Sequence, residues 1–317
     1  MYSWVMRSRL IALLCVCALG AGASAQQQPT FKAGSDQVRV FATVLDHDGR
    51  LVTNLTRDQF EIRDDGKPQP LTLFDNTPQP IRLIEMLDVS GSMEGNLGIL
   101  RDASDELFAR LRPDDMARVG SFGREVLISE PFTHDRKELR AMLPNYIAPD
   151  APTPLWRALD QAMTALRKDE EPRHAILVLS DGKDTGSMTP GFQRHVASQA
   201  EVIDRAREDA VMIYAVGLHS RMRPSGMGST DMRTMMLSDL PDPGLAKVAE
   251  ETGGGYLEIR GGDDLGGAFA RVADELHGQY LLGYAPPKRD GKVHNVEVRV
   301  TEKGLKPRAR KSYLAPK

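Results

Sequence analysis

The sequence predicts an α/β protein with a doubly wound, mostly parallel sheet and a small flanking β-domain. Two observations predict this fold. From residue 81 onward, apolar runs of strand length alternate with segments whose apolar residues recur at helical spacing. Before residue 80 and after residue 285, short alternating runs separated by turns indicate β-strands. Alternation of strands and helices is typical of a parallel sheet with helices on both faces.

The flanking β-domain is expected from the N-terminal strands, with the C-terminal strands as a possible second contribution. In the N-terminal part, strands are expected at residues 37–45, 60–63 and 71–74, with turns at 46–49 and 64–66. In the tail, residues 293–300 alternate as a strand does, and residues 308–314 are a candidate for one more. The predicted boundaries are residues 1–25 for an export signal, 26–79 for the β-domain, 80–285 for the α/β domain and 286–317 for a C-terminal β-extension.

The α/β domain is expected to contain six strands and six helices. Gly123 and Arg124 separate two short strands, which predicts a hairpin with an antiparallel edge strand. The expected strands are residues 81–87, 117–122, 126–129, 175–179, 211–216 and 256–259. The expected helices are residues 97–111, 139–143, 155–166, 196–207, 245–251 and 265–276.

The N-terminus is typical of a cleavable export signal. Arg7 and Arg9 precede the apolar run 10–19, and Ala23-Ser24-Ala25 supplies small residues at a cleavage site. The alternative is an uncleaved anchor helix, although the apolar run is shorter than the ~20 residues that a spanning helix needs. We therefore expect an exported protein, either periplasmic or secreted.

Composition excludes several kinds of site. The chain has two cysteines, and both, Cys15 and Cys17, lie within the predicted signal. The mature chain would then have no disulfide, no thiolate metal site and no cysteine nucleophile. The formal net charge of −3 argues against nucleic acid as the main partner.

A group of oxygen-bearing residues follows the first apolar strand of the α/β domain. Asp88, Ser90 and Ser92 form an Asp-Val-Ser-Gly-Ser turn directly after the run 81–87. One carboxylate and two hydroxyls within five residues offer hard oxygen donors at one point. Two further candidates lie downstream: Thr153, just before a predicted helix, and Asp181, at the end of a second apolar strand.

These residues resemble the metal-ion-dependent adhesion site of von Willebrand factor type A (VWA) domains, whose first element is Asp-x-Ser-x-Ser. The resemblance implies that Ser90 and Ser92 ligate the ion directly and that Asp88 and Asp181 do so directly or through water. Thr153 would coordinate directly when a partner is bound. The implied ion is Mg²⁺, with Mn²⁺ or Ca²⁺ as alternatives, and the implied partner is a protein that supplies an Asp or Glu carboxylate. The chain as a whole resembles exported bacterial proteins with a VWA-related domain.

Each element also has a purely structural interpretation. The Asp88 turn is a candidate helix cap, and Thr153 is a candidate N-cap with Pro154 at the first helical position. Two features depart from the family pattern: prolines at 152 and 154 bracket the threonine, and Arg82 and Glu85 interrupt a strand that should be buried. A buried charge is costly unless it is paired, so both residues are expected to pair with each other or with neighbours.

The leading functional hypothesis is a non-enzymatic module that binds an acidic residue of a partner through the ion. A metal-dependent hydrolase resembling a phosphatase is the first alternative, because a Mg²⁺ site at a sheet edge also serves phosphoryl transfer. Against it, position 90 is a serine and no general base lies beside the motif. The second alternative is a structural envelope component whose metal stabilises the fold.

Two other features are less specific. The segment 219–243 is long and rich in Gly, Ser and Met, which is typical either of disorder or of a surface that adapts to a partner. The seven histidines are scattered singly, so surface or packing roles are expected for them.

Overall fold

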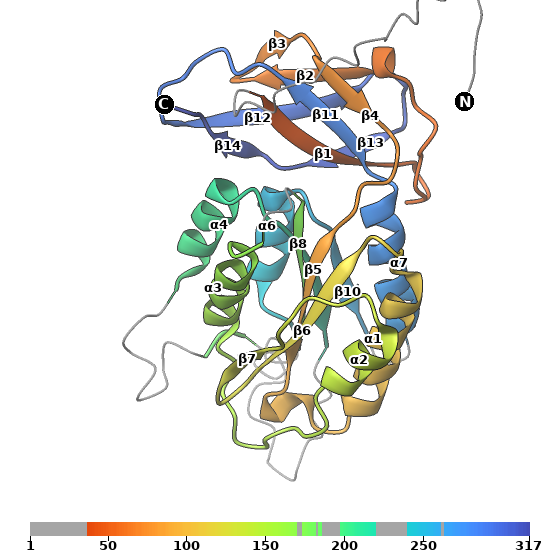
Figure 1. Cartoon of the computed structure of the whole chain (residues 1–317), viewed down its shortest axis with the longest axis vertical. Helices are drawn as coiled ribbons and strands as arrows, with labels where there is room; N and C mark the ends of the chain where they lie inside the picture. Colours follow the sequence, from red (N-terminus) through yellow and green to blue (C-terminus); the bar gives the residue numbers. More distant parts are fainter. Residues whose placement is uncertain (1–36, 170–172, 182, 186–196, 220–239, 261–262) are drawn as a thin grey trace, which may run out of the picture. The chain divides into compact units, whose positions relative to one another are not determined.

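The computed structural model describes residues 37–169, 173–181, 183–185, 197–219, 240–260 and 263–317. These residues form an α/β part and a β part (Figure 1). The predicted signal, residues 1–25, lies outside them, as does most of the segment 219–243. None of the helices that the structure describes is long and apolar enough to cross a membrane.

The α/β part is built on one six-stranded sheet, and the predicted fold class is confirmed. All neighbouring strands are parallel except the last pair, β6 and β7, which form the predicted antiparallel edge hairpin. In order across the sheet, the strands are β10 (Tyr256–Ile259), β9 (Met212–Leu218), β8 (His174–Ser180), β5 (Arg82–Asp88), β6 (Met116–Phe122) and β7 (Val126–Ile128).

Helices cover both faces of this sheet because successive residues of its strands point to opposite sides. Leu83 and Leu87 of β5 belong to the core under one set of helices, and Ile84 and Met86 to the core under the other. The first set is α1 (Leu97–Arg110), α2 (Arg136–Met142) and α7 (Leu265–His277). The second set is α3 (Leu155–Leu166), α4 (Gln199–Glu208) and α6 (Pro243–Thr252) (Figure 1).

The two charged residues of β5 are accommodated by neighbours rather than by each other. Arg82 Nε lies 3.4 Å from a carboxylate oxygen of Asp169. Glu85 is fully buried, and one of its oxygens accepts a 2.8 Å hydrogen bond from the Ser104 hydroxyl of α1. Burial, and secondarily the charge of Asp105, raises the pKa of Glu85 to about 8, so this carboxyl holds its proton at neutral pH.

The β part consists of two four-stranded sheets that share one apolar core. The tail strands join the N-terminal strands in both sheets, as the prediction of a flanking β-domain allowed. One sheet has the order β13 (Lys306–Ala309), β1 (Val38–Leu45), β11 (Tyr280–Tyr284), β4 (Leu73–Asp75). The other has the order β14 (Ser312–Leu314), β12 (Val293–Val300), β2 (Phe60–Asp64), β3 (Lys67–Gln69).

The last predicted strand, residues 308–314, is two strands in the structure. β13 pairs with β1 and β14 pairs with β12, so the chain crosses from one sheet to the other between them. Arg310 and Lys311 form this crossing. The crossing lies close to α6, because the Lys311 amide donates to the Glu251 carbonyl.

Candidate metal centre

Two strand ends bring the predicted metal-binding residues to one edge of the sheet. Asp88 is the last residue of β5, and Asp181 follows the last residue of β8. These strands are parallel neighbours, with Leu87 opposite Leu179. The two carboxylates therefore leave adjacent strands at the carboxyl edge, where open α/β sheets bind their ligands.

Hydrogen bonds join four of the five predicted residues into one group. The Ser90 amide donates to Asp88 Oδ1 at 2.9 Å, and the hydroxyls of Ser90 and Ser92 lie 3.1 Å apart. The Ser92 hydroxyl then donates to Asp181 Oδ1 at 2.6 Å. A continuous row of oxygens thus links the first loop to the second strand end.

Thr153 is held beside this group through its backbone. Gly91 packs so closely on the segment before Thr153 that a Cβ at position 91 would lie 1.8 Å from the Pro149 carbonyl oxygen. On the other side, the Thr153 amide donates to the Thr185 hydroxyl at 2.8 Å, and the Thr185 amide donates to the Thr153 carbonyl at 3.0 Å. Thr153 therefore lies between the two loops that carry Ser92 and Asp181.

The interpretation of Thr153 as a helix cap is wrong. α3 begins at Leu155 and its N-cap is Pro154, one residue after Thr153. Within the part of the chain that the structure describes, the Thr153 hydroxyl makes no hydrogen bond to the other four side chains. The threonine is buried, with 5% of its surface exposed.

The two carboxylates of the group are electrostatically unfavourable in isolation. Burial, and then the negative charge of Asp181, raises the pKa of Asp88 to about 7. Burial also raises the pKa of Asp181. Asp88 is fully buried and accepts hydrogen bonds from the Ser90 amide, from the Ser90 hydroxyl and from the Ser180 hydroxyl, the last at 2.5 Å.

The residues present fit a small divalent cation. Mg²⁺ prefers oxygen ligands and keeps several waters, and this edge offers carboxylate and hydroxyl oxygens alone. Asp88 and Asp181, at the two ends of the row, are fully buried, and the row reaches solvent at Ser92. A cation there would offset the repulsion between Asp88 and Asp181.

Comparison with known families agrees with the fold of the α/β part. A family model described as von Willebrand factor type A domain matches residues 83–183, a range that contains all five predicted residues. The α/β part of the chain therefore has a VWA-like fold. VWA domains often bind a divalent metal.

Several solved structures are similar to the chain at low identity. One is BatB from Bacteroides thetaiotaomicron, at 16% identity over 62% of this chain and 98% of that one, with a TM-score of 0.45. Another is a von Willebrand factor type A protein from Catenulispora acidiphila, at 13% identity over 90% of this chain and 75% of that one, with a TM-score of 0.47. A third is the vWF domain of the type V pili tip protein Mfa5 from Porphyromonas gingivalis, at 12% identity over 62% and 95%, with a TM-score of 0.45. A search of curated proteins gave no match.

Sequence reasoning missed Ser180, the last residue of β8 in the α/β part. Its hydroxyl is fully buried and donates to Asp88 Oδ2. The available signal was its position directly before Asp181, at the end of an apolar strand. Ser180 holds the buried Asp88 carboxylate in place from the neighbouring strand.

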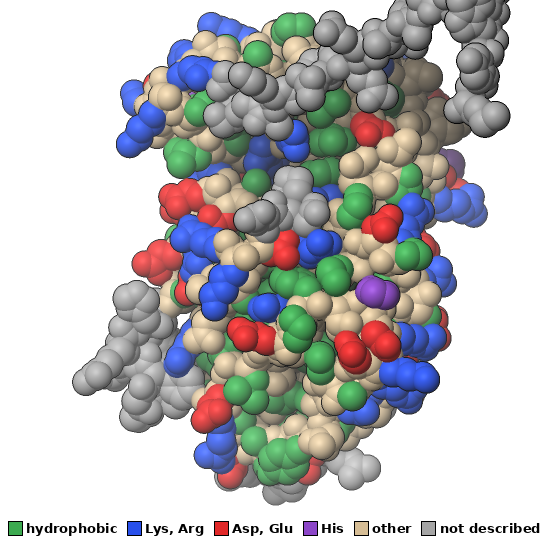
Figure 2. Space-filling view, in the orientation of Figure 1, with side chains coloured by type: hydrophobic (Ala, Val, Ile, Leu, Met, Phe, Trp, Pro, Cys, Tyr) green, Lys and Arg blue, Asp and Glu red, His purple; other side chains and the backbone are tan. Residues whose placement is uncertain are grey.

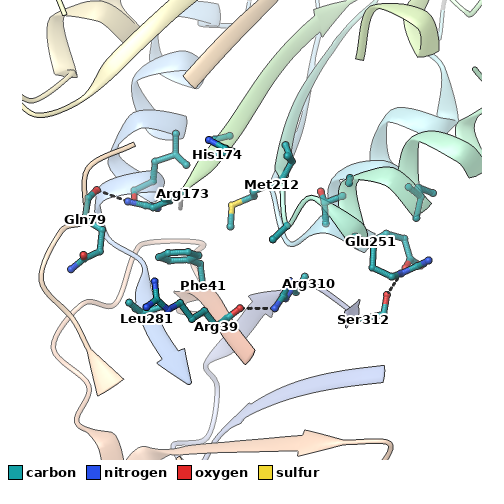
Figure 3. A pocket seen from close by; sticks show the side chains of 18 of the residues that line it. Arg39, Phe41, Gln79, Arg173, His174, Met212, Glu251, Leu281, Arg310 and Ser312 are labelled. Carbon is teal, nitrogen blue, oxygen red and sulfur yellow. Dashed lines mark hydrogen bonds between the residues drawn. The ribbon is translucent and has the colours of Figure 1, made fainter. Parts of the chain in front are cut away.

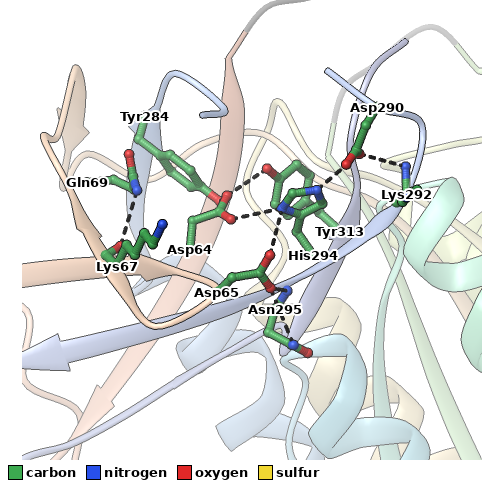
Figure 4. A network of polar contacts seen from close by, with 10 residues as sticks. All are labelled: Asp64, Asp65, Lys67, Gln69, Tyr284, Asp290, Lys292, His294, Asn295 and Tyr313. Carbon is green, nitrogen blue, oxygen red and sulfur yellow. Dashed lines mark hydrogen bonds and ion pairs between the residues drawn. The ribbon is translucent and has the colours of Figure 1, made fainter. Parts of the chain in front are cut away.

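Sequence reasoning also missed a buried polar cluster in the β part (Figure 4). His294 Nδ1 lies 3.0 Å from Asp64 and 3.1 Å from Asp65, and Nε2 lies 3.1 Å from Asp290. The hydroxyls of Tyr284 and Tyr313 donate to Asp64 Oδ2 at 2.9 and 2.6 Å. The residues of this cluster lie far apart in the sequence, so no motif with a fixed spacing could have indicated that they meet.

Proposed function

We propose that this chain is an exported, Mg²⁺-dependent protein-interaction module that binds an acidic side chain of its partner. The observation that carries the proposal is the hydrogen-bonded row from Asp88 through Ser90 and Ser92 to Asp181. Thr153, held beside that row, is the fifth proposed ligand. Mn²⁺ and Ca²⁺ are alternative ions for the same oxygens.

The choice of ligands supports binding of an acidic partner. Ser90, Ser92 and Thr153 are neutral donors, so the two carboxylates are the protein's anionic contribution. An ion held this way keeps Lewis acidity for an incoming carboxylate oxygen. A third carboxylate at position 90 or 92 would weaken that attraction, because it would cancel more of the positive charge.

A groove beside the site supports a protein as the partner. It runs along β6 and β7, and Val89, between Asp88 and Ser90, contributes to its wall. Two large apolar side chains line it in an exposed position: Tyr146 is 67% exposed and Leu127 is 60% exposed. A partner residue that reached the ion would place its neighbours over these side chains.

The remaining parts of the proposal concern location and partner class. We propose that residues 1–25 direct export and that the protein acts in the periplasm or outside the cell. On the face shown in Figure 2, acidic and basic side chains are interspersed over the α/β part. This mixture, together with the net charge of −3, favours a protein partner over nucleic acid. The domain boundaries given above stay predictions.

The test combines ion binding with partner capture. Wild type, Asp88→Ala and Ser90→Ala are titrated with Mg²⁺ by calorimetry and used as baits in an envelope extract with Mg²⁺ or EDTA. We expect Mg²⁺ binding and partner capture by wild type in Mg²⁺ alone. The matched control is Asp58→Ala, because Asp58 is an exposed carboxylate of the β part.

Three outcomes would contradict the proposal. Recovery of the same proteins with every bait and in both buffers would show that the interaction does not depend on the ion. Turnover of a phosphate ester by wild type but not by Asp88→Ala would identify a hydrolase instead. A large fall in melting temperature in EDTA, with capture unchanged, would identify a structural ion.

A further inference from the structure

A cavity of about 120 Å³ lies at the opposite end of the sheet from the metal centre. Its walls come from β1, from the start of β8, from α4 and α6, and from the crossing between β13 and β14 (Figure 3). Gln79 and Pro80, which precede β5, and Arg173, which precedes β8, line it. Because β5 runs from Arg82 to Asp88, the cavity and the metal centre lie about 20 Å apart.

The lining of the cavity is mainly basic among its charged residues. Arg39, Arg173, Arg207 and Arg310 line it, and Glu251 is the one acidic residue among its described lining. Arg207 is partly neutralised, since it lies 2.5 Å from an Asp204 carboxylate oxygen and donates to the Ser312 hydroxyl at 2.6 Å. The charge of a ligand in the cavity therefore depends on the guanidiniums of Arg39, Arg173 and Arg310.

Arg173 is buried without a carboxylate partner among the described residues. It is 5% exposed, and it donates to the Gln79 carbonyl at 2.6 Å, to the Leu276 carbonyl and to the Gln279 side-chain oxygen at 2.8 Å. These acceptors are all neutral. Burial lowers the pKa of Arg173 to about 10, which reflects the cost of keeping this charge out of water.

Arg310, on the crossing between the two sheets, is only partly exposed. One of its terminal nitrogens donates to the Arg39 carbonyl at 2.6 Å. Its Nε is buried and has no hydrogen-bond partner in the described part of the chain. Burial lowers the pKa of Arg310 to about 10 as well. A buried donor of a charged group left without an acceptor is costly, so an anion in the cavity would stabilise it.

The rest of the lining is apolar. The guanidinium carbon of Arg173 lies over the Phe41 ring, 4.8 Å from the centre of that ring. Ile203, Met212 and Leu281 complete this wall. A cavity of ~150 Å³ binds benzene, so the space matches a body slightly smaller than or equal to one aromatic ring.

We propose that this cavity binds a small organic carboxylate whose apolar body is about the size of a benzene ring. The carboxylate pairs with Arg173 and Arg310, and the body packs against Phe41 and the aliphatic wall. The proposal does not depend on the metal centre. Binding at the amino ends of β5 and β8 leaves Asp88 and Asp181 untouched.

The experiment titrates the full chain with benzoate and measures affinity by calorimetry, with benzamide and acetate as matched probes. Benzamide keeps the shape without the charge, and acetate keeps the charge without the ring. We expect benzoate to bind at least tenfold more tightly than either. Affinity for benzoate should be the same in Mg²⁺ and in EDTA, so a failure of the proposed ion site would not affect this result.

Variants locate the binding to the cavity. Arg173→Gln and Arg310→Gln should each weaken benzoate binding at least tenfold, whereas Arg136→Gln, which changes an exposed arginine of α2, should have no effect. Ala206→Leu fills the cavity from α4 without changing charge and should also abolish binding. The melting temperature of Ala206→Leu shows whether this variant is folded. If an arginine variant does not fold, Ala206→Leu still tests the cavity.

Four results would overturn the proposal. They are equal affinity for benzoate and benzamide, equal affinity for benzoate and acetate, unchanged affinity in a folded Ala206→Leu variant, and no benzoate binding by wild type up to its solubility limit.

Discussion

The Asp64 cluster of the β part and the Asp88 loop of the α/β part each contain a fully buried carboxylate, but the charges around that carboxylate differ. In the Asp64 cluster, His294 lies within 3.1 Å of three carboxylates. Hydrogen bonds and charges from Asp64 and its neighbours raise the pKa of His294 against the effect of burial. Both ring nitrogens of His294 face carboxylate oxygens, which accept but do not donate hydrogen bonds when ionised, so this arrangement favours the charged imidazolium.

The Asp88 loop has hydroxyls where the other cluster has an imidazolium. The described donors to Asp88 are the Ser90 amide and the hydroxyls of Ser90 and Ser180, all neutral, and the pKa of Asp88 is raised to about 7. In the Asp64 cluster, the histidine therefore offsets part of the negative charge from within the protein. The described contacts of Asp88 include no cationic donor, and this difference supports the proposal of a cation from solution at the Asp88 loop.

Glu85 is a buried carboxyl whose charge is neutralised in a third way. It is fully buried, and its second oxygen has no hydrogen-bond partner in the described residues. Its pKa of about 8 means that a proton, not a metal or a histidine, neutralises it. The three environments make different predictions for stability.

The largest expected effect comes from removing the internal cation. His294→Ala leaves the Asp64 carboxylate, which is 1% exposed, buried without its charge partner. Breaking a buried pair costs about 3–5 kcal/mol, so the free energy of unfolding in urea at pH 7 should fall by about that amount. His134→Ala, at an exposed histidine, is the control. A loss below ~1 kcal/mol would mean that His294 is not the counter-charge.

The second effect is a pH dependence that belongs to Glu85. Because its folded pKa is raised from 4.5 to about 8, the native state holds a proton that the unfolded state releases between these values. The stability from this group is fully present below pH 4.5 and is lost as the pH rises through 8. Relative to Glu85→Gln, wild type should lose on the order of 3 kcal/mol between pH 5 and 8.

Urea unfolding of both proteins at several pH values, at constant Mg²⁺, measures this difference. Glu106→Gln, which changes an exposed carboxyl of the same region, should follow wild type. Parallel curves for wild type and Glu85→Gln would show that the buried carboxyl is already ionised at pH 5.

The third effect is the response to the ion. Mg²⁺ at 100 times its dissociation constant should raise the free energy of unfolding of wild type by about 2.7 kcal/mol. Asp88→Asn and Ser90→Ala should lose most of this gain, because each removes a proposed ligand. His294→Ala should keep the gain in full. A gain that follows His294 and not Asp88 would reverse the comparison between the two clusters.

The sequence predicted the sheet of the α/β part and the candidate site because their signals are local. The apolar run 81–87 and the turn after it are contiguous, and the parallel order of strands brings Asp88 and Asp181 to one edge. The geometry at Thr153 was harder to foresee, since the N-cap of the helix is Pro154, which has no side-chain donor or acceptor to mark it in the sequence.

The Asp64 cluster and the basic cavity could not be predicted in the same way. Asp64 and His294 are separated by 230 positions and meet because β12 pairs with β2. The crossing at Arg310 arises because β13 and β14 join different sheets, whereas the sequence there reads as one strand. Pairings between distant strands leave no periodic pattern, so the charges that they bring together appear only in the structure.

The smallest expected effect separates the histidine from the tyrosines of the Asp64 cluster. Tyr313→Phe removes a hydroxyl that donates to Asp64 Oδ2 at 2.6 Å, while Tyr284 still donates to the same oxygen at 2.9 Å. Hydrogen bonds to charged groups contribute about 1.5–3 kcal/mol, and the remaining donor places the expected loss near the lower end of that range. Tyr146→Phe, at a tyrosine that is 67% exposed, should cost nothing measurable in the same urea experiment. If Tyr313→Phe were as damaging as His294→Ala, neutral donors alone would stabilise a buried carboxylate as well as a cation does, and the Asp88 loop would then have no need of an ion.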